Sequence, residues 1–310
     1  MTAPATLRRV FVGPVGIRAG WRLLLFVVLA QGVIGLPLQW FVVRVLGLGD
    51  GGEWTAPGFI LAETVGGLGI VPTFATAWLM SRMERRPFGA YGLPSRGAFG
   101  RRFWAGWGWG LGGVALLAAL IAAVGGLGVA GWALSGAALA RAALLWAIAM
   151  TLIGLAEEFA FRGYPQFTLA SGIGFWRAAA LLSLVFGGLH YFLKPMENLA
   201  DFASVGLIGL FLCLTLRRTG SLWFAVGFHA GFDYAALTIV GAPNTGNGGR
   251  PISDHLLVTT FTGPDWLTGG AYGLEGGAAC TIALLISTVI IWRAKLFVRA
   301  DVGAYQKPDR

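Results

Sequence analysis

The chain has 310 residues, of which 56% are hydrophobic and only 12% are charged, and its mean hydropathy is +0.71. Soluble domains carry about 25% charged residues, so this chain has too few polar side chains to cover a surface that faces water. A soluble globular protein, a disordered chain and a fibrous protein are therefore excluded. The composition predicts a polytopic membrane protein.

Long apolar stretches recur along the chain, and a helix needs roughly 20 apolar residues to cross the hydrocarbon core of a bilayer. These stretches are continuously apolar rather than alternating, which argues against a β-barrel. We therefore predict an all-α membrane bundle that forms a single membrane domain over residues 1–310. About eight transmembrane helices are expected, with seven or nine as alternatives, at 22–45, 59–80, 103–127, 140–170, 176–193, 202–216, 222–241 and 275–293.

The distribution of positive charge predicts the orientation in the membrane. With the N-terminus in the cytoplasm, all but four of the 23 Lys and Arg residues fall on the inner side. The exceptions are Arg44, Arg141, Lys194 and Arg250. We therefore expect a multi-pass protein of the inner, cytoplasmic membrane with both termini in the cytoplasm, and we expect 242–274 to form an external loop. The net charge of +9 then favours membrane lipids, not nucleic acid, as partners.

Ionisable side chains inside apolar spans are costly, so each is a candidate functional residue. Three spans carry most of them, with Glu157, Glu158 and Arg162 in 140–170, His190 in 176–193, and His229 and Asp233 in 222–241. Residues four apart share a helix face, so Glu158 can pair with Arg162, and His229 with Asp233. Glu157 points about 100° away from Glu158, so the two glutamates can take different roles.

The three spans can place these groups at one depth only if the fourth helix is long. We expect it to continue through Pro165 to about residue 170, with a kink at Pro165 because proline removes a backbone hydrogen bond. The side chains would then line one polar cavity that opens to the cytoplasmic side. Glu63, in the second span, is interpreted as a structural residue that bonds a neighbouring helix, with a place in the cavity as the alternative.

The motifs resemble those of the CPBP family of intramembrane proteases, which includes CAAX proteases and bacteriocin-processing enzymes and is also called the Abi family. That family carries EExxxR, FxxxH and HxxxN or HxxxD on successive transmembrane helices. Here the motifs read Glu157-Glu158-Phe159-Ala160-Phe161-Arg162, Phe186-Gly187-Gly188-Leu189-His190 and His229-Ala230-Gly231-Phe232-Asp233. The resemblance covers about 140–241, expected to be the catalytic core, and the third motif ends in Asp rather than the commoner Asn.

The resemblance implies an intramembrane endopeptidase that hydrolyses a peptide or protein substrate. A desolvated carboxylate suits a general base, and the two histidines can supply charge or donors for the oxyanion. Two mechanisms stay open. In one, Glu157, His190 and His229 hold Zn²⁺ or another divalent metal, as in a metalloprotease; in the other, a glutamate activates water without a metal. Because helical spacing pairs Glu158 with Arg162, Glu157 is nominated as the base, and Asp233 is expected to orient a histidine.

Two other classes of protein bury similar residues. A proton-coupled transporter uses carboxylates and histidines as a relay, but the sequence shows neither internal repeats nor broken helices in matching halves. A non-enzymatic scaffold or immunity protein would keep the fold without the chemistry, and the intact motif residues argue against it. The sequence does not specify the substrate or the oligomeric state.

Overall fold

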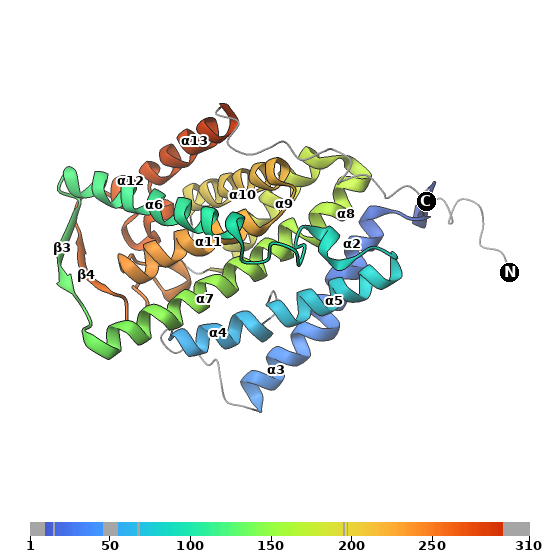
Figure 1. Ribbon diagram of the computed structural model, residues 1–310, viewed down its shortest axis with the longest axis horizontal. Coiled ribbons are helices and arrows are strands. Elements are labelled where there is room, and N and C mark those ends of the chain that lie inside the picture. Colours follow the sequence, from blue (N-terminus) through green and yellow to red (C-terminus); the bar gives the residue numbers. More distant parts are fainter. Residues whose placement is uncertain are drawn as a thin grey trace.

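The computed structural model describes residues 10–14, 16–45, 55–66, 69–194, 196 and 198–293. Helices form most of it (Figure 1). The longer helices are α2 (Ala19–Val27), the π-helical η1 (Val28–Gly35), α3 (Leu36–Arg44), α4 (Ala56–Val65), α5 (Ile70–Met83), α6 (Arg101–Ala123), α7 (Gly136–Arg162), α8 (Tyr164–Ile173), α9 (Phe175–Leu193), α10 (Leu199–Thr219), α11 (Trp223–Asp233), the π-helical η3 (Tyr234–Ile239) and α13 (Ala278–Arg293). The short elements are strands β1 (Val12–Gly13), β2 (Gly16–Ile17), β3 (Leu127–Trp132) and β4 (Leu257–Phe261), the helix α12 (Asp265–Thr268) and 3-10 turns η2 (Phe88–Tyr91), η4 (Thr245–Asn247), η5 (Gly270–Tyr272) and η6 (Leu274–Gly276).

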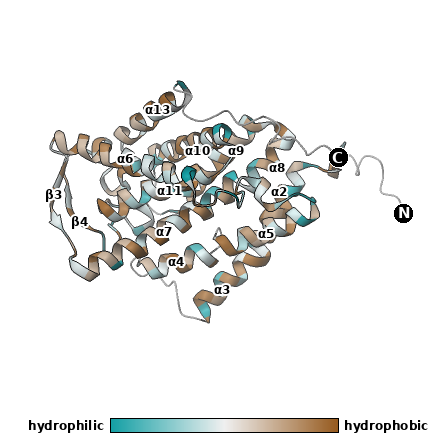
Figure 2. Ribbon diagram, viewed as in Figure 1, coloured by the Kyte–Doolittle hydropathy of each residue, from teal (hydrophilic) through white to brown (hydrophobic). Residues whose placement is uncertain are grey.

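Six segments of the described chain are long and apolar enough to cross a membrane. They are Ala19–Arg44, Ala56–Met83, Arg101–Ala123, Gly136–Ile173, Phe175–Leu193 and Leu199–Thr219. Large apolar side chains face outward along them, as with Leu116, Leu144 and Leu184, each more than half exposed. The hydrophobic colouring covers most of the helix surfaces (Figure 2). The predicted all-α membrane bundle is thereby confirmed, and the chain is an integral, multi-pass membrane protein.

Within the described residues, the other two predicted spans form helices shorter than a bilayer crossing. The first, 222–241, forms α11 and then η3, and the second, 275–293, forms the end of η6 and then α13, up to the last described residue. Every residue of α11 is either buried or lines a cavity between the helices. A helix that is enclosed by protein does not need to match the thickness of the hydrocarbon core, so its length is not set by the bilayer. The described residues thus contain six helices of full spanning length, where the sequence predicts about eight.

The fourth predicted span is broken near its end, but not where the sequence predicts. α7 ends at Arg162, and Gly163 leaves helical geometry with φ −81° and ψ −124°. Pro165 then lies in the first turn of α8, where its missing N–H has no intrahelical partner to lose. The expected continuous helix with a kink at Pro165 is therefore wrong. The two helices still form one apolar segment, so Glu158 remains within it.

Glycines bring α6, α11 and α7 into backbone contact. A Cβ at Gly106 or Gly110 of α6 would overlap the backbone of α11, and one at Gly227 or Gly231 of α11 would overlap the backbone of α6. On the opposite side of α11, a Cβ at Gly154 of α7 would lie 2.9 Å from the Val226 carbonyl oxygen. Small residues of this kind allow the close helix packing that membrane bundles use. α11 is consequently held between α6 and α7 (Figure 1).

The 242–274 segment is more ordered than a predicted loop. Its strand β4 pairs antiparallel with β3, which connects α6 to α7. The register runs from Leu127 opposite Phe261 to Trp132 opposite Leu257, with an irregularity between Val129 and Gly131. The pair lies at one end of the bundle (Figure 1) and ties the segment to the ends of α6 and α7.

A partly buried polar cluster joins α2, α5 and α8 beyond the end of α7. The carboxylate of Glu84 accepts hydrogen bonds from Tyr164 at 2.6 Å and from Tyr91 at 2.9 Å, and it forms an ion pair with Arg22 at 3.2 Å. Burial and the neighbouring Glu84 carboxylate raise the pKa of Tyr91, so its hydroxyl stays a donor at neutral pH. The cluster fixes α8 in place after the break at Gly163.

Candidate active site

Glu157 and Glu158 are adjacent on α7 but lie in different surroundings. Glu158 is fully buried, and its Oε1 lies 3.2 Å from Nη1 of Arg162, one turn later. Glu157 is partly exposed and lines a large cavity. The difference follows from helix geometry, because consecutive residues point about 100° apart. One glutamate is thus closed off in an ion pair while the other is accessible to a bound molecule.

The charged guanidinium of Arg162 is buried, and aromatic and small residues surround it. Its guanidinium lies 4.3 Å from the ring centroid of Phe186 on α9, a cation–π arrangement. A Cβ at Gly209 of α10 would come within 2.6 Å of Arg162 Nη2, so glycine leaves room for the guanidinium. A charge removed from water in this way requires a partner, and Glu158 supplies it.

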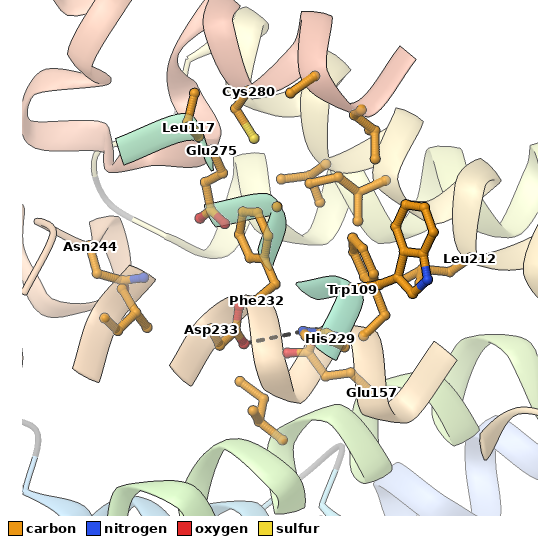
Figure 3. Close-up of a pocket in the computed structure, with 18 of the residues that line it drawn as sticks. Trp109, Leu117, Glu157, Leu212, His229, Phe232, Asp233, Asn244, Glu275 and Cys280 are labelled. Carbon is orange, nitrogen blue, oxygen red and sulfur yellow. Dashed lines mark ion pairs between the residues drawn. The ribbon is translucent and has the colours of Figure 1, made fainter. Parts of the chain in front are cut away.

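His229 on α11 lies close to three carboxylates, of which Figure 3 labels those of Glu157 and Asp233. Its Nδ1 lies 3.0 Å from Oε1 of Glu158, and its Nε2 lies 3.3 Å from Oδ2 of Asp233, one turn later. Oε2 of Glu157 lies 3.8 Å from the same Nε2. The spacing of the first and third motifs therefore places their side chains on facing sides of α7 and α11, where they meet.

These contacts have a consequence for the protons of the cluster. A neutral imidazole carries a single N–H, so it donates from only one ring nitrogen. Both nitrogens of His229 face carboxylate oxygens at hydrogen-bond distance. Two hydrogen bonds therefore require a second proton, either on the ring or on a carboxyl group. Such a proton would lie beside Glu157, whose Oε2 is 3.8 Å from Nε2 of His229.

His190, on α9, lines the same cavity but is held by a different kind of contact. Its Nδ1 lies 2.9 Å from the backbone carbonyl oxygen of Phe186, one turn earlier. The carbonyl fixes the proton on Nδ1 and leaves Nε2 as the acceptor of a neutral ring. Because Phe186 also packs on Arg162, the second motif contacts the first through this phenylalanine.

The cavity has a volume of about 1580 Å³ and lies among α4, α6, α7, α9, α10, α11 and α13. Its walls are mainly apolar, with Leu116, Leu212 and Ile286 among the lining residues. The ionisable lining residues are Glu63, Glu157, His190, Lys194, His229, Asp233 and Glu275. It exceeds the 300–1,000 Å³ typical of pockets for small molecules, so it has room for a segment of peptide.

Four of the six predicted site residues line this cavity, and the other two form a buried ion pair next to it. Glu158 and Arg162 are buried, whereas Glu157, His190, His229 and Asp233 face the cavity. Three further charged groups join them. Glu63, interpreted from the sequence as structural, lines the cavity from α4, Lys194 lines it from the end of α9, and Glu275 lines it from η6. Glu63 lies on a different helix from the motifs, so residue spacing could not connect it to them. Its only sequence signal was an ionisable side chain inside an apolar span.

The predicted metal ligands do not fit a metal ion in this arrangement. Among the described residues, no three His, Cys, Asp or Glu side chains converge on a point that could hold one. A ligating imidazole needs an unprotonated nitrogen that faces the ion. Both nitrogens of His229 instead face carboxylates, and Nδ1 is already bonded to Glu158.

Comparison with known proteins connects this geometry to one family. Residues 139–235 match the family model of Rce1-like type II CAAX prenyl endopeptidases. Comparisons with curated proteins and with solved structures gave no match. The matched range contains α9, α10 and α11 entire and most of α7, and with them all three motifs and the residues that meet around His229. The segment that builds the site is therefore similar to the Rce1-like CAAX endopeptidases, in agreement with the resemblance to CPBP proteases.

Proposed function

We propose that this protein is an intramembrane endopeptidase that hydrolyses a peptide bond in the cavity. One observation carries the proposal: Glu157, His190, His229 and Asp233, from the segment that matches a protease family, all line one cavity large enough for a peptide. Residues 140–241 then form the catalytic core of a single membrane domain. The substrate is a peptide or protein segment, and membrane lipids surround the bundle.

Glu157 is the proposed general base, because its carboxylate reaches the cavity while that of Glu158 does not. Glu157 takes a proton from water, and the water oxygen forms a bond with the carbonyl carbon of the substrate. The electron pair of the C=O bond moves to the oxygen. As the C–N bond breaks, Glu157 returns the proton to the nitrogen, so the products are a carboxylic acid and an amine.

The histidines have separate proposed roles. Nε2 of His190, an acceptor in the neutral ring, accepts a hydrogen bond from the attacking water and orients it. The second proton shared by His229 and its carboxylates stabilises the negative oxygen through its positive charge, since both ring nitrogens already face carboxylates. Asp233 and Glu158 position the His229 ring through its two nitrogens, and Arg162 balances the charge of Glu158.

The test compares two isosteric variants, Glu157→Gln and Glu158→Gln, in detergent. Each protein is incubated with a peptide mixture from a digested proteome, and new termini are identified by mass spectrometry. We expect Glu157→Gln to keep its melting temperature and lose cleavage. Glu158→Gln strands Arg162 without its anion and should be destabilised by about 3–5 kcal/mol. Loss of cleavage at unchanged stability in Glu158→Gln alone would reverse the assignment.

The same assay tests the metal-assisted alternative and the other classes of function. Because the ligand set does not fit a metal, EDTA and 1,10-phenanthroline should leave cleavage unchanged. A loss that Zn²⁺ restores would instead support a metalloprotease. Identical peptide profiles from wild type and both variants would instead favour a function as a scaffold, an immunity protein or a proton-coupled transporter.

A further inference from the structure

Glu63 is a carboxylate outside the three motifs that lies beside the proposed catalytic groups. It lines the cavity from α4, and Glu157, His229 and Asp233 line the same cavity. Within the part of the chain that the structure describes, its carboxylate has no hydrogen-bond donor and no ion-pair partner. His229, which could carry a positive charge, already lies within 4 Å of three other carboxylates.

The position of Glu63 on its helix adds to this excess of negative charge. α4 ends at Val65, and Gly66 is its C-cap, so Glu63 lies in the last turn. The C-terminal end of a helix carries a partial negative charge from carbonyls that lack intrahelical donors. A carboxylate there is disfavoured, whereas a cation is favoured.

The cavity as a whole has the same imbalance. Its lining contains four carboxylates, those of Glu63, Glu157, Asp233 and Glu275, against one ammonium group, that of Lys194, and two imidazoles. In a mainly apolar cavity, a negative charge without a partner is costly, and a bound cation removes the cost.

We propose that Glu63 binds the ammonium or guanidinium group of a substrate side chain, so that the cavity selects peptides with Lys or Arg at one fixed position relative to the cut. This inference rests on the proposed protease function. The apolar walls fit the same ligand, because Phe59 and Ala62 line the cavity near Glu63. Lys and Arg place their methylene stems along such surfaces and their charged groups on a polar partner.

The experiment uses the full chain in detergent and peptides from a proteome digested with a glutamyl endopeptidase, which leaves internal Lys and Arg intact. Wild type, Glu63→Gln and Glu275→Gln are compared. Glu275→Gln is the matched control, because it removes the same charge from another wall of the cavity. One cleaved sequence is then resynthesised with Lys or with uncharged norleucine at the enriched position, and the ratio of the two kcat/KM values is measured.

We expect wild-type cleavage sites to be enriched in Lys or Arg at one position, and Glu275→Gln to keep this enrichment. Glu63→Gln should lower the Lys-to-norleucine ratio by about tenfold or more, the value of a hydrogen bond between charged groups. Glu63→Arg should shift the preference to acidic residues.

A wild-type profile without basic enrichment, or a ratio that Glu63→Gln leaves unchanged, would overturn the inference while the protease function stands. Identical profiles from wild type and Glu157→Gln would overturn both.

Discussion

Arg162 carries a full positive charge in a place that water does not reach, with an exposure of 1%. Its anion, Glu158, is even more deeply buried and belongs to the same helix face. Such a pair is costly to desolvate, and removing one partner is worse than removing both, because it leaves an unpaired buried charge. The pair therefore behaves as one unit, and it holds His229 through the oxygen that the two share.

Replacing Arg162 with methionine should destabilise the protein by about 3–5 kcal/mol, because Glu158 is left without its cation. Adding Glu158→Met to this variant should recover part of the loss, since neither charge then remains. The control is Arg177→Met on α9, an exposed position where a change within about 0.5 kcal/mol is expected. Thermal melting in detergent measures all three. Equal losses from Arg162→Met and Arg177→Met would show that the buried pair adds no stability.

At this scale the sequence predicts the pairs within a helix well. The four-residue spacing of Glu158 with Arg162 and of His229 with Asp233 is realised as direct contacts. Contacts between different helices cannot be predicted from the spacing of residues along the chain. The bond from His229 to Glu158 and the approach of Glu63 depend on how α4, α7 and α11 pack, and no short-range pattern reports that.

Among the elements, the crossing of α6 and α11 positions the site most directly. Gly227→Ala would place a methyl group against the Phe103 carbonyl of α6 and force the helices apart. A cost of about 1–3 kcal/mol is expected from such overpacking, together with reduced cleavage because His229 and Asp233 move with α11. Gly108→Ala is the control, since a Cβ there meets no atom within 4 Å. Alanine at that position should be neutral or slightly stabilising, because glycine is unfavourable inside a helix. Equal melting temperatures for the two variants would contradict this account of the crossing.

The elements that the sequence did not predict have local causes. Gly163 ends α7 two residues before the proline that marked the expected kink, because a proline in the first turn of a new helix costs little. The pairing of β3 with β4 joins segments more than 120 residues apart in the sequence, and each strand is short. Hydropathy detects apolar length, so it identified the helices but not this pairing.

For the whole molecule, we propose that both termini lie in the cytoplasm and that 242–274 faces outward. Ser95→Cys, in the predicted inner loop 82–102, should react with a membrane-impermeant maleimide only after cells are opened. Thr262→Cys, at an exposed position of the outer segment, should react in intact cells. The native Cys213 and Cys280 are buried and should not react with the maleimide. Labelling of Ser95→Cys in intact cells would reverse the orientation.

The enclosure of α11 has a further consequence for how the protein responds to its membrane. Outer helices adapt to a thicker or thinner bilayer by tilting, at a modest cost per ångström of mismatch. α11 has no such adjustment to make, because its residues contact protein or the cavity rather than lipid. Its depth is set by the backbones of α6 and α7, which hold it from two sides. His229 and Asp233 therefore move with α6 and α7, so the thickness of the bilayer reaches these two groups only through the tilt of the helices that hold α11.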